Sequence, residues 1–152
     1  MTIQDQIISD IKNAMKAKDQ EKLRVLRSLK AKLMEKEISE RTKGEATLSE
    51  EQTVEVLMKA AKQRKESITQ FEEGGRKDLA ENEKRELQLI ETYLPKMMSE
   101  DEVRAIVKEK ITEVGASGPQ DMGKVMGPLM ASLKGKADGG LVSQIVKEEL
   151  AE

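Results

Sequence analysis

Helix start and stop signals recur along this chain and divide it into short segments. Ser49 with Gln52, and Ser99 with Glu102, have the spacing of a capping box, which satisfies free backbone N–H groups at a helix N-terminus. Glycine or proline follows several segments, at 74–75, 95 and 115. Between these signals apolar residues recur every three or four positions, the period of an amphipathic helix. The pattern therefore predicts an all-α fold with no strand.

The same signals predict the domain organisation. We expect helices over residues 2–17, 19–40, 49–73, 78–94, 99–114, 119–133 and 140–150, with a loop over residues 42–48. Pro128 removes one backbone hydrogen bond within the sixth helix, so a kink or a tight first segment is expected there. The break at Pro95 separates four longer helices from three shorter ones. This predicts an N-terminal four-helix domain, residues 1–95, and a small C-terminal three-helix domain, residues 96–152.

The composition narrows the classes of function. Lys and Arg total 27 against 29 Asp and Glu, so a generally basic nucleic-acid binder is excluded and any such surface must be local. The absence of Cys and His removes thiol chemistry, the usual general base and the commonest metal ligand. We therefore expect no metal, no cofactor and no catalysis by this chain on its own. A polar, acidic N-terminus and the lack of a long apolar run predict a cytoplasmic protein that does not bind membranes.

One segment, residues 121–140, is both glycine-rich and basic. It contains no acidic residue between Met122 and Ala137, although acids and bases alternate elsewhere. Two interpretations are open: a flexible basic turn in a small helical domain, or an anion-binding turn where backbone N–H groups begin a helix. The second would use backbone N–H groups of the last two glycines and Leu141, with lysines beside them. Its candidate phosphate-binding residues are Lys124, Lys134, Gly135, Lys136, Gly139 and Gly140.

A phosphate-binding P-loop is a weaker alternative for the start of this segment. Residues 118–125, G-P-Q-D-M-G-K-V, have the required glycine and lysine spacing. Val125 replaces the Ser or Thr that would hold magnesium, and no strand is predicted upstream. We therefore reject a nucleotide-hydrolysing P-loop.

The motif D-M-G-K-V-M-G-P-L-M, followed by L-K-G-K-A-D-G, resembles the C-terminal signature of the GatB/YqeY family. Four further motifs, L-R-S-L-K-A, K-Q-R-K-E-S-I, G-G-R-K-D-L-A and Y-L-P, appear in the family order over residues 26–95. The family occurs as the tail of the B subunit of tRNA-dependent amidotransferases and as a small free-standing protein. The resemblance implies a helical N-terminal domain and a small three-helix domain that contacts tRNA.

Several charged residues fall on predicted apolar helix faces. Arg64 lies among apolar residues of the third helix, Glu83 and Glu86 among those of the fourth, and Arg27 and Lys30 beside those of the second. Buried charges require partners, because desolvating an unpaired ion costs several kcal/mol. Three interpretations remain: ion pairs between helices, long side chains whose charged ends reach solvent, or a catalytic carboxylate pair, Glu83 with Glu86. Matched opposite charges favour the ion pairs.

The leading functional hypothesis is a tRNA-binding accessory protein, monomeric and without chemistry of its own. A second is a docking module for a larger tRNA-processing enzyme, using methionines 122, 126 and 130, which otherwise fill a small core. The resemblance also implies carbon–nitrogen ligase activity with glutamine as amido donor, in a complex only. A hydrolase using Glu83 and Glu86 is a further alternative.

Overall fold

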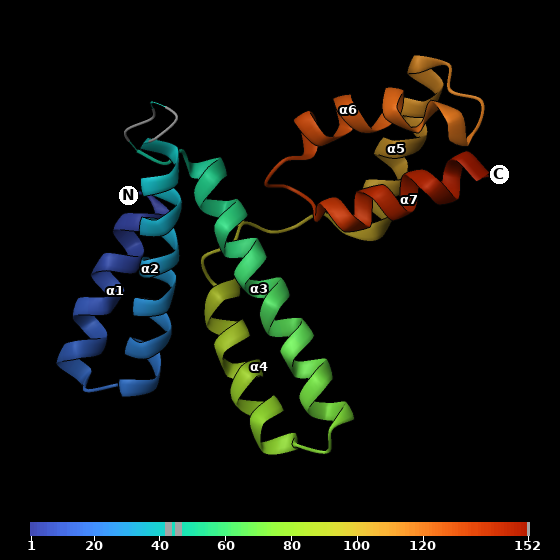
Figure 1. Ribbon diagram of the computed structural model, residues 1–152. Coiled ribbons are helices and arrows are strands. Elements are labelled where there is room, and N and C mark those ends of the chain that lie inside the picture. Colours follow the sequence, from blue (N-terminus) through green and yellow to red (C-terminus); the bar gives the residue numbers. More distant parts are fainter. Residues whose placement is uncertain (42–43, 45–46, 152) are drawn as a thin grey trace. The chain divides into compact units, whose positions relative to one another are not determined.

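The computed structural model describes residues 1–41, 44 and 47–151 (Figure 1). Within these residues every regular element is helical, so the predicted all-α class is confirmed. The elements are α1 Ile3–Ala17, α2 Gln20–Arg41, α3 Glu50–Glu73, α4 Lys77–Glu91, α5 Glu100–Val114, the 3-10 turn η1 Pro119–Asp121, α6 Met122–Leu133 and α7 Gly139–Ala151. The loop expected over residues 42–48 falls largely outside the described residues, at 42–43 and 45–46.

The chain divides into two compact units, Met1–Pro95 and Lys96–Glu152. Each unit has its own cluster of buried apolar side chains, and no described residue belongs to both clusters. The two units are therefore treated separately below.

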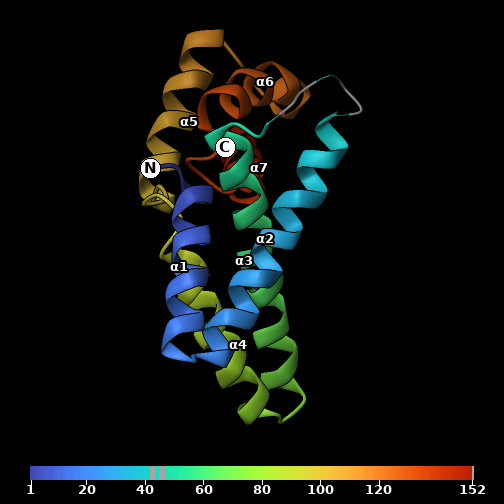
Figure 2. The same cartoon turned by 90° about the vertical axis from the view of Figure 1, so that its left-hand side faces the viewer.

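Two antiparallel helical hairpins form the first unit, α1 with α2 and α3 with α4 (Figure 1). Thr2 and Asp5 form a capping box that starts α1, and Lys18 ends this helix in the left-handed region with a φ of 56°. The Asp19 carboxylate then accepts the Lys22 N–H at 3.1 Å, which fixes the start of α2. In the view of Figure 2 the α1–α2 hairpin lies in front of α3 and α4.

Leucines from α2 and α3 form the centre of the first core. Leu26, Leu29 and Leu57 are no more than 2% exposed, and burying each stabilises the fold by roughly 1.5–3 kcal/mol. Tyr93, just after α4, donates its hydroxyl hydrogen bond to Asp10 of α1. Burial, and then this hydrogen bond, raise the pKa of Tyr93 above its ordinary value. The contact ties the last residues of the unit to its first helix.

The second unit consists of α5, α6 and α7, each packed against the other two. Val107, Leu129 and Val142, one from each helix, are completely buried. The Met98 N–H, just before α5, donates to the Lys136 carbonyl at 3.0 Å. This bond holds the segment after α6 against the start of the unit.

Several helix ends differ from those expected, and three of the differences have a local cause. The fourth helix ends at Glu91, because Thr92–Leu94 form turns before Pro95. The segment expected to open the sixth helix is the separate 3-10 turn η1, and α6 then runs through Pro128. The last helix begins at Gly139, one residue early, because the Asp138 carbonyl accepts the Val142 N–H at 3.1 Å.

Candidate nucleic-acid interface

The basic segment between α6 and α7 is a tight, hydrogen-bonded turn. The Leu133 carbonyl accepts the N–H groups of Lys136 at 2.9 Å and Ala137 at 3.1 Å. Gly135 has a φ of 76°, a conformation that side-chain-bearing residues rarely adopt, so glycine is required there. Ala137 is buried in the core of the unit, whereas Lys134 and Lys136 are exposed on either side of Gly135. The turn thus has a defined shape that presents both lysines to solvent.

The start of α7 is occupied by a carboxylate from the chain itself. The Gly140 N–H donates to Asp138 Oδ1 at 3.4 Å. A phosphate at this N-terminus would therefore meet a negative charge, which corrects the expectation that the backbone N–H of Gly140 is open to a ligand. Gly139 has a different role: a Cβ there would lie 3.0 Å from the terminal methyl of Met130. The Gly140 N–H is thus engaged within the chain, and the lysine side chains are the cationic candidates for a phosphate contact at this turn.

The three candidate lysines differ in their surroundings. Lys124 is highly exposed but forms an ion pair with Asp121 at 3.5 Å. Lys136 is exposed and forms no ion pair with any described residue. Lys134, also exposed, interacts within the chain. Lys136 is therefore the candidate whose charge is most available to a ligand.

Asp121 also forms a hydrogen bond at the start of the segment that resembled a P-loop. Its carboxylate accepts the backbone N–H of Ser117 at 3.0 Å, and this hydrogen bond is the main cause of its lowered pKa. Nearby Lys124 lowers the pKa of Asp121 further. One backbone N–H next to this segment is thus directed toward a carboxylate of the chain.

Two glycines leave part of the α6 surface without side chains. Gly123 and Gly127 are exposed, and a Cβ added at either would have no atom within 4 Å. A glycine within a helix costs about 1 kcal/mol relative to alanine. Because no packing within the described chain requires them, these glycines leave room for close approach by another molecule.

Three acids of this unit gather around Arg104 on α5. This guanidinium lies 2.7 Å from carboxylate oxygens of both Glu148 and Glu149, and 3.1 Å from Glu100. The hydrogen bond from Arg104 is the largest cause of the lowered pKa of Glu148. Arg104 thus engages three acids, whereas residues 122–137, which we call the α6–turn face, contain no acid and are flanked by Asp121 and Asp138.

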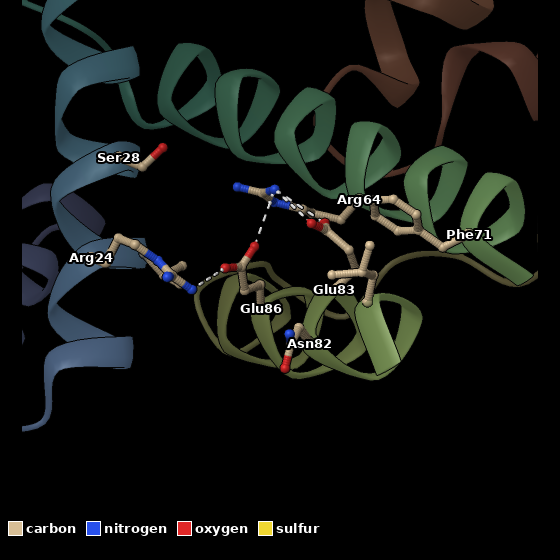
Figure 3. Close-up of a pocket in the computed structure, with 9 residues that line it drawn as sticks. Arg24, Ser28, Arg64, Phe71, Asn82, Glu83 and Glu86 are labelled. Atoms are coloured by element: carbon tan, nitrogen blue, oxygen red, sulfur yellow. Dashed lines mark hydrogen bonds and ion pairs between the residues drawn. The ribbon is translucent and has the colours of Figure 1, made fainter. Parts of the chain in front are cut away.

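The charges on apolar faces of the first unit meet as ion pairs (Figure 3). Arg64 Nη1 lies 3.1 Å from oxygens of both Glu83 and Glu86. Arg24 of α2 approaches the second carboxylate oxygen of Glu86 at 3.0 Å. The Glu86 side chain is only 9% exposed, so two arginines offset the desolvation of one buried carboxylate.

Arg27 and Lys30 do not join this cluster, contrary to expectation. Both are exposed, and neither forms an ion pair with a described residue. Arg24 was missed because a helix wheel does not show which neighbour covers each side of the helix. The residue that could have indicated the position of Arg24 is the adjacent Val25, which is buried and lines the same cavity.

This cavity, of about 390 Å³, has paired charges along its wall. Ser28, Phe71 and Asn82 complete the part labelled in Figure 3. Because Arg64 already binds both carboxylates, Glu83 and Glu86 have the surroundings of structural ion pairs rather than of a free acid and base. Among the described residues no group of His, Cys, Asp or Glu has the arrangement of a metal site.

The methionines of α6 divide between core and surface. Met122 and Met126 pack against the buried cluster of the second unit, whereas Met130 is 39% exposed. Filling the core therefore accounts for two of the three. No helix in the described part of the chain is long and apolar enough to cross a membrane.

Comparison with known proteins gives two kinds of relative. The chain is 28% identical over 143 residues to "Altered inheritance of mitochondria protein 41, mitochondrial" of Pyrenophora tritici-repentis, covering 92% of this chain and 76% of that protein. The protein of the same name from Lachancea thermotolerans is 36% identical over 112 residues, 72% of this chain and 58% of its own. The E subunit of glutamyl-tRNA(Gln) amidotransferase from Thermococcus sibiricus is 42% identical over 74 residues, 46% of this chain and 12% of that protein.

The family itself is shown by a match over almost the whole sequence. The model described as "Yqey-like protein" matches residues 4–150. This match includes both units and all the motifs that carried the resemblance. The chain therefore belongs to the YqeY family, whose relatives include the amidotransferase E subunits.

Proposed function

We propose that this protein is a tRNA-binding accessory protein that has no chemistry of its own and contacts the phosphate backbone with the α6–turn face. The observation that carries the proposal is a segment, residues 122–137, that contains three lysines and no acidic residue, with Asp121 and Asp138 flanking it. Lys136 and the exposed glycines of α6 lie on this segment. Phosphate contacts require cations and close approach rather than a deep pocket.

The relatives support a role beside a larger tRNA-modifying enzyme. The similar region makes up 12% of the glutamyl-tRNA(Gln) amidotransferase E subunit of Thermococcus sibiricus. A segment of that size is suited to substrate binding while the rest of such a protein does other work. Carbon–nitrogen ligase activity with glutamine as donor would therefore require a complex. A tRNA-binding role suits a cytoplasmic location and also the mitochondrial relatives, because proteins are made in both compartments.

The test is tRNA binding by the Lys134→Ala/Lys136→Ala variant over a series of salt concentrations. Removing each lysine that binds a phosphate should reduce the slope of log affinity against log salt by roughly one unit, similarly for all tRNA sequences. Lys108→Ala/Lys147→Ala is the matched control, since these exposed lysines lie in the same unit and form no ion pair with a described residue. Far-UV circular dichroism should show unchanged folding for both variants.

Two results would contradict the proposal differently. Equal effects of the two double variants would show that net charge, rather than the turn, determines binding. Failure of the wild-type protein to bind any tRNA would reject the function itself.

A further inference from the structure

The outer side of the α1–α2 hairpin has an apolar surface that no other described element of its unit covers. Ile8, Met15, Met34 and Ile38 are 42–57% exposed, and they are most of the large apolar side chains exposed among the described residues. Ile8 and Met34 line a shallow groove of about 110 Å³ between the two helices. In Figure 2 this hairpin faces the viewer, with α3 and α4 behind it.

Helical spacing extends the surface along the hairpin. Met15 lies two turns beyond Ile8 on α1, and Ile38 lies one turn beyond Met34 on α2. We refer to these four residues as the hairpin face. Single exposed apolar residues are ordinary, but a group along one side of two packed helices is typical of an interaction site.

Around the hairpin face, more of the basic than of the acidic side chains lack an ion-pair partner among the described residues. Lys12 lies one turn from Ile8, Lys30 lines the groove, and Arg27 lies one turn before Lys30. None of these three cations forms an ion pair with a described residue. Of the acids beside the face, Glu37 pairs with Arg41 at 3.1 Å, whereas Asp5 accepts the Thr2 N–H and keeps its charge. The available charge around the apolar surface is therefore positive.

We propose that the hairpin face docks an amphipathic helix of a partner protein, with an apolar stripe bordered by Asp and Glu. A helix laid in the groove between two packed helices buries its apolar stripe as a third member of the bundle. Acidic flanks would pair with Lys12, Arg27 and Lys30, and charge complementarity of this kind sets partner choice and orientation. A second copy of this chain would bring the same surplus of positive charge to the contact, which opposes self-association. The partner is thus a different protein with an acidic helix.

The surface belongs to the first unit, so the inference is independent of tRNA binding by α6. It also accounts for Arg27 and Lys30, whose exposure the ion-pair interpretation leaves unexplained. Methionine at two of its four apolar positions is typical of surfaces that adapt to a bound helix.

The experiment uses the full chain and three helical peptides of about 18 residues, long enough for five helical turns. The peptides share one leucine stripe at positions i, i+3, i+4 and i+7 and carry Glu, Gln or Lys along its flanks. Fluorescence anisotropy should rank their affinities Glu, then Gln, then Lys, with at least tenfold between the first and the last. Methyl NMR shifts from the Glu peptide should concentrate at Ile8, Met15, Met34 and Ile38.

Charge reversal tests the pairing itself. Arg27→Glu/Lys30→Glu should reverse the ranking so that the Lys peptide binds best, because both side chains are exposed and the fold tolerates the change. Lys59→Glu/Lys62→Glu, on exposed positions of α3, makes the same change in net charge and should keep the wild-type ranking. Met34→Ser/Ile38→Ser should weaken the Glu peptide by at least tenfold.

Several outcomes would overturn the proposal. These are no binding of the Glu peptide, equal affinity for all three peptides, or methyl shifts away from the hairpin face. Binding of phosphatidylserine vesicles that depends on the same residues would assign the face to a membrane. Self-association abolished by Ile38→Ser would assign it to a second copy of the chain.

Discussion

Arg64 shows how one side chain can satisfy two carboxylates in a mostly apolar setting. Its guanidinium comes from α3 and meets Glu83 and Glu86, which lie one turn apart on α4. A planar, permanently charged fork suits this arrangement better than a lysine ammonium. The cluster therefore fixes the register of α3 against α4, and Arg24 links it to α2.

Removing Arg64 should destabilise the first unit strongly. Arg64→Ala leaves the nearly buried Glu86 with only Arg24, which is 69% exposed, so we expect a loss of roughly 3 kcal/mol or more in the free energy of unfolding. Urea denaturation followed by circular dichroism measures this loss. Arg24→Ala is the matched control and should cost only about 1 kcal/mol, because Arg24 is itself largely exposed and Arg64 still pairs with Glu86.

Adding Glu86→Gln to Arg64→Ala should recover part of the loss, because the uncompensated charge is then removed. An unchanged urea midpoint for Arg64→Ala would mean that its charged end is solvated and that the pairs contribute nothing to stability.

At the residue scale, the sequence predicted which charged residues form ion pairs only where those residues lay well inside an apolar helix face. Arg64, Glu83 and Glu86 each lie inside an apolar arc, and they meet. Arg27 and Lys30 lie at the edge of such an arc, and Lys30 lines the groove with α1. Which side of α2 faces α1 and which faces α4 depends on tertiary packing, and a helix wheel carries no such information.

Helix boundaries were predictable because capping is local chemistry. Ser49 and Ser99 accept the N–H groups three residues on, and Gly115 ends α5 with a φ of 69°. The carboxylate that caps α7 was harder to anticipate, since Asp138 looked like part of a glycine-rich loop. That one hydrogen bond engages the Gly140 N–H, one of the three backbone groups expected to face a phosphate.

The glycines of α6 should lower the stability of the second unit and allow close contact with tRNA. Gly123→Ala and Gly127→Ala place a methyl in open space, so each should stabilise the second unit by about 1 kcal/mol. If tRNA lies against this side of α6, the same changes should weaken binding. Thermal melting and tRNA titration at one salt concentration measure the two effects together.

Gly115→Ala serves as the control. Its positive φ makes alanine unfavourable by about 1–2 kcal/mol, and its position after α5 gives no reason for weaker binding. Stabilised α6 variants with unchanged affinity would show that the glycines are not contact positions.

At the scale of the whole molecule, the two separate cores predict separate unfolding. Leu26 and Leu57 lie in one core and Leu129 and Val142 in the other. Tyr93 and Phe71, the two aromatic residues of the chain, both belong to the first unit. Near-ultraviolet circular dichroism therefore reports the first unit alone, whereas the far-ultraviolet signal reports the helices of both.

Leu129→Ala should unfold the second unit selectively. Removing this fully buried side chain costs about 2–5 kcal/mol, which is comparable with the whole stability expected of so small a core. The far-ultraviolet signal should lose the share contributed by α5, α6 and α7, while the near-ultraviolet transition of Tyr93 keeps its wild-type midpoint. Leu57→Ala should do the converse, lowering the Tyr93 midpoint first. If either substitution shifts both signals together, the chain unfolds as one cooperative body, and its second unit depends on the first for stability.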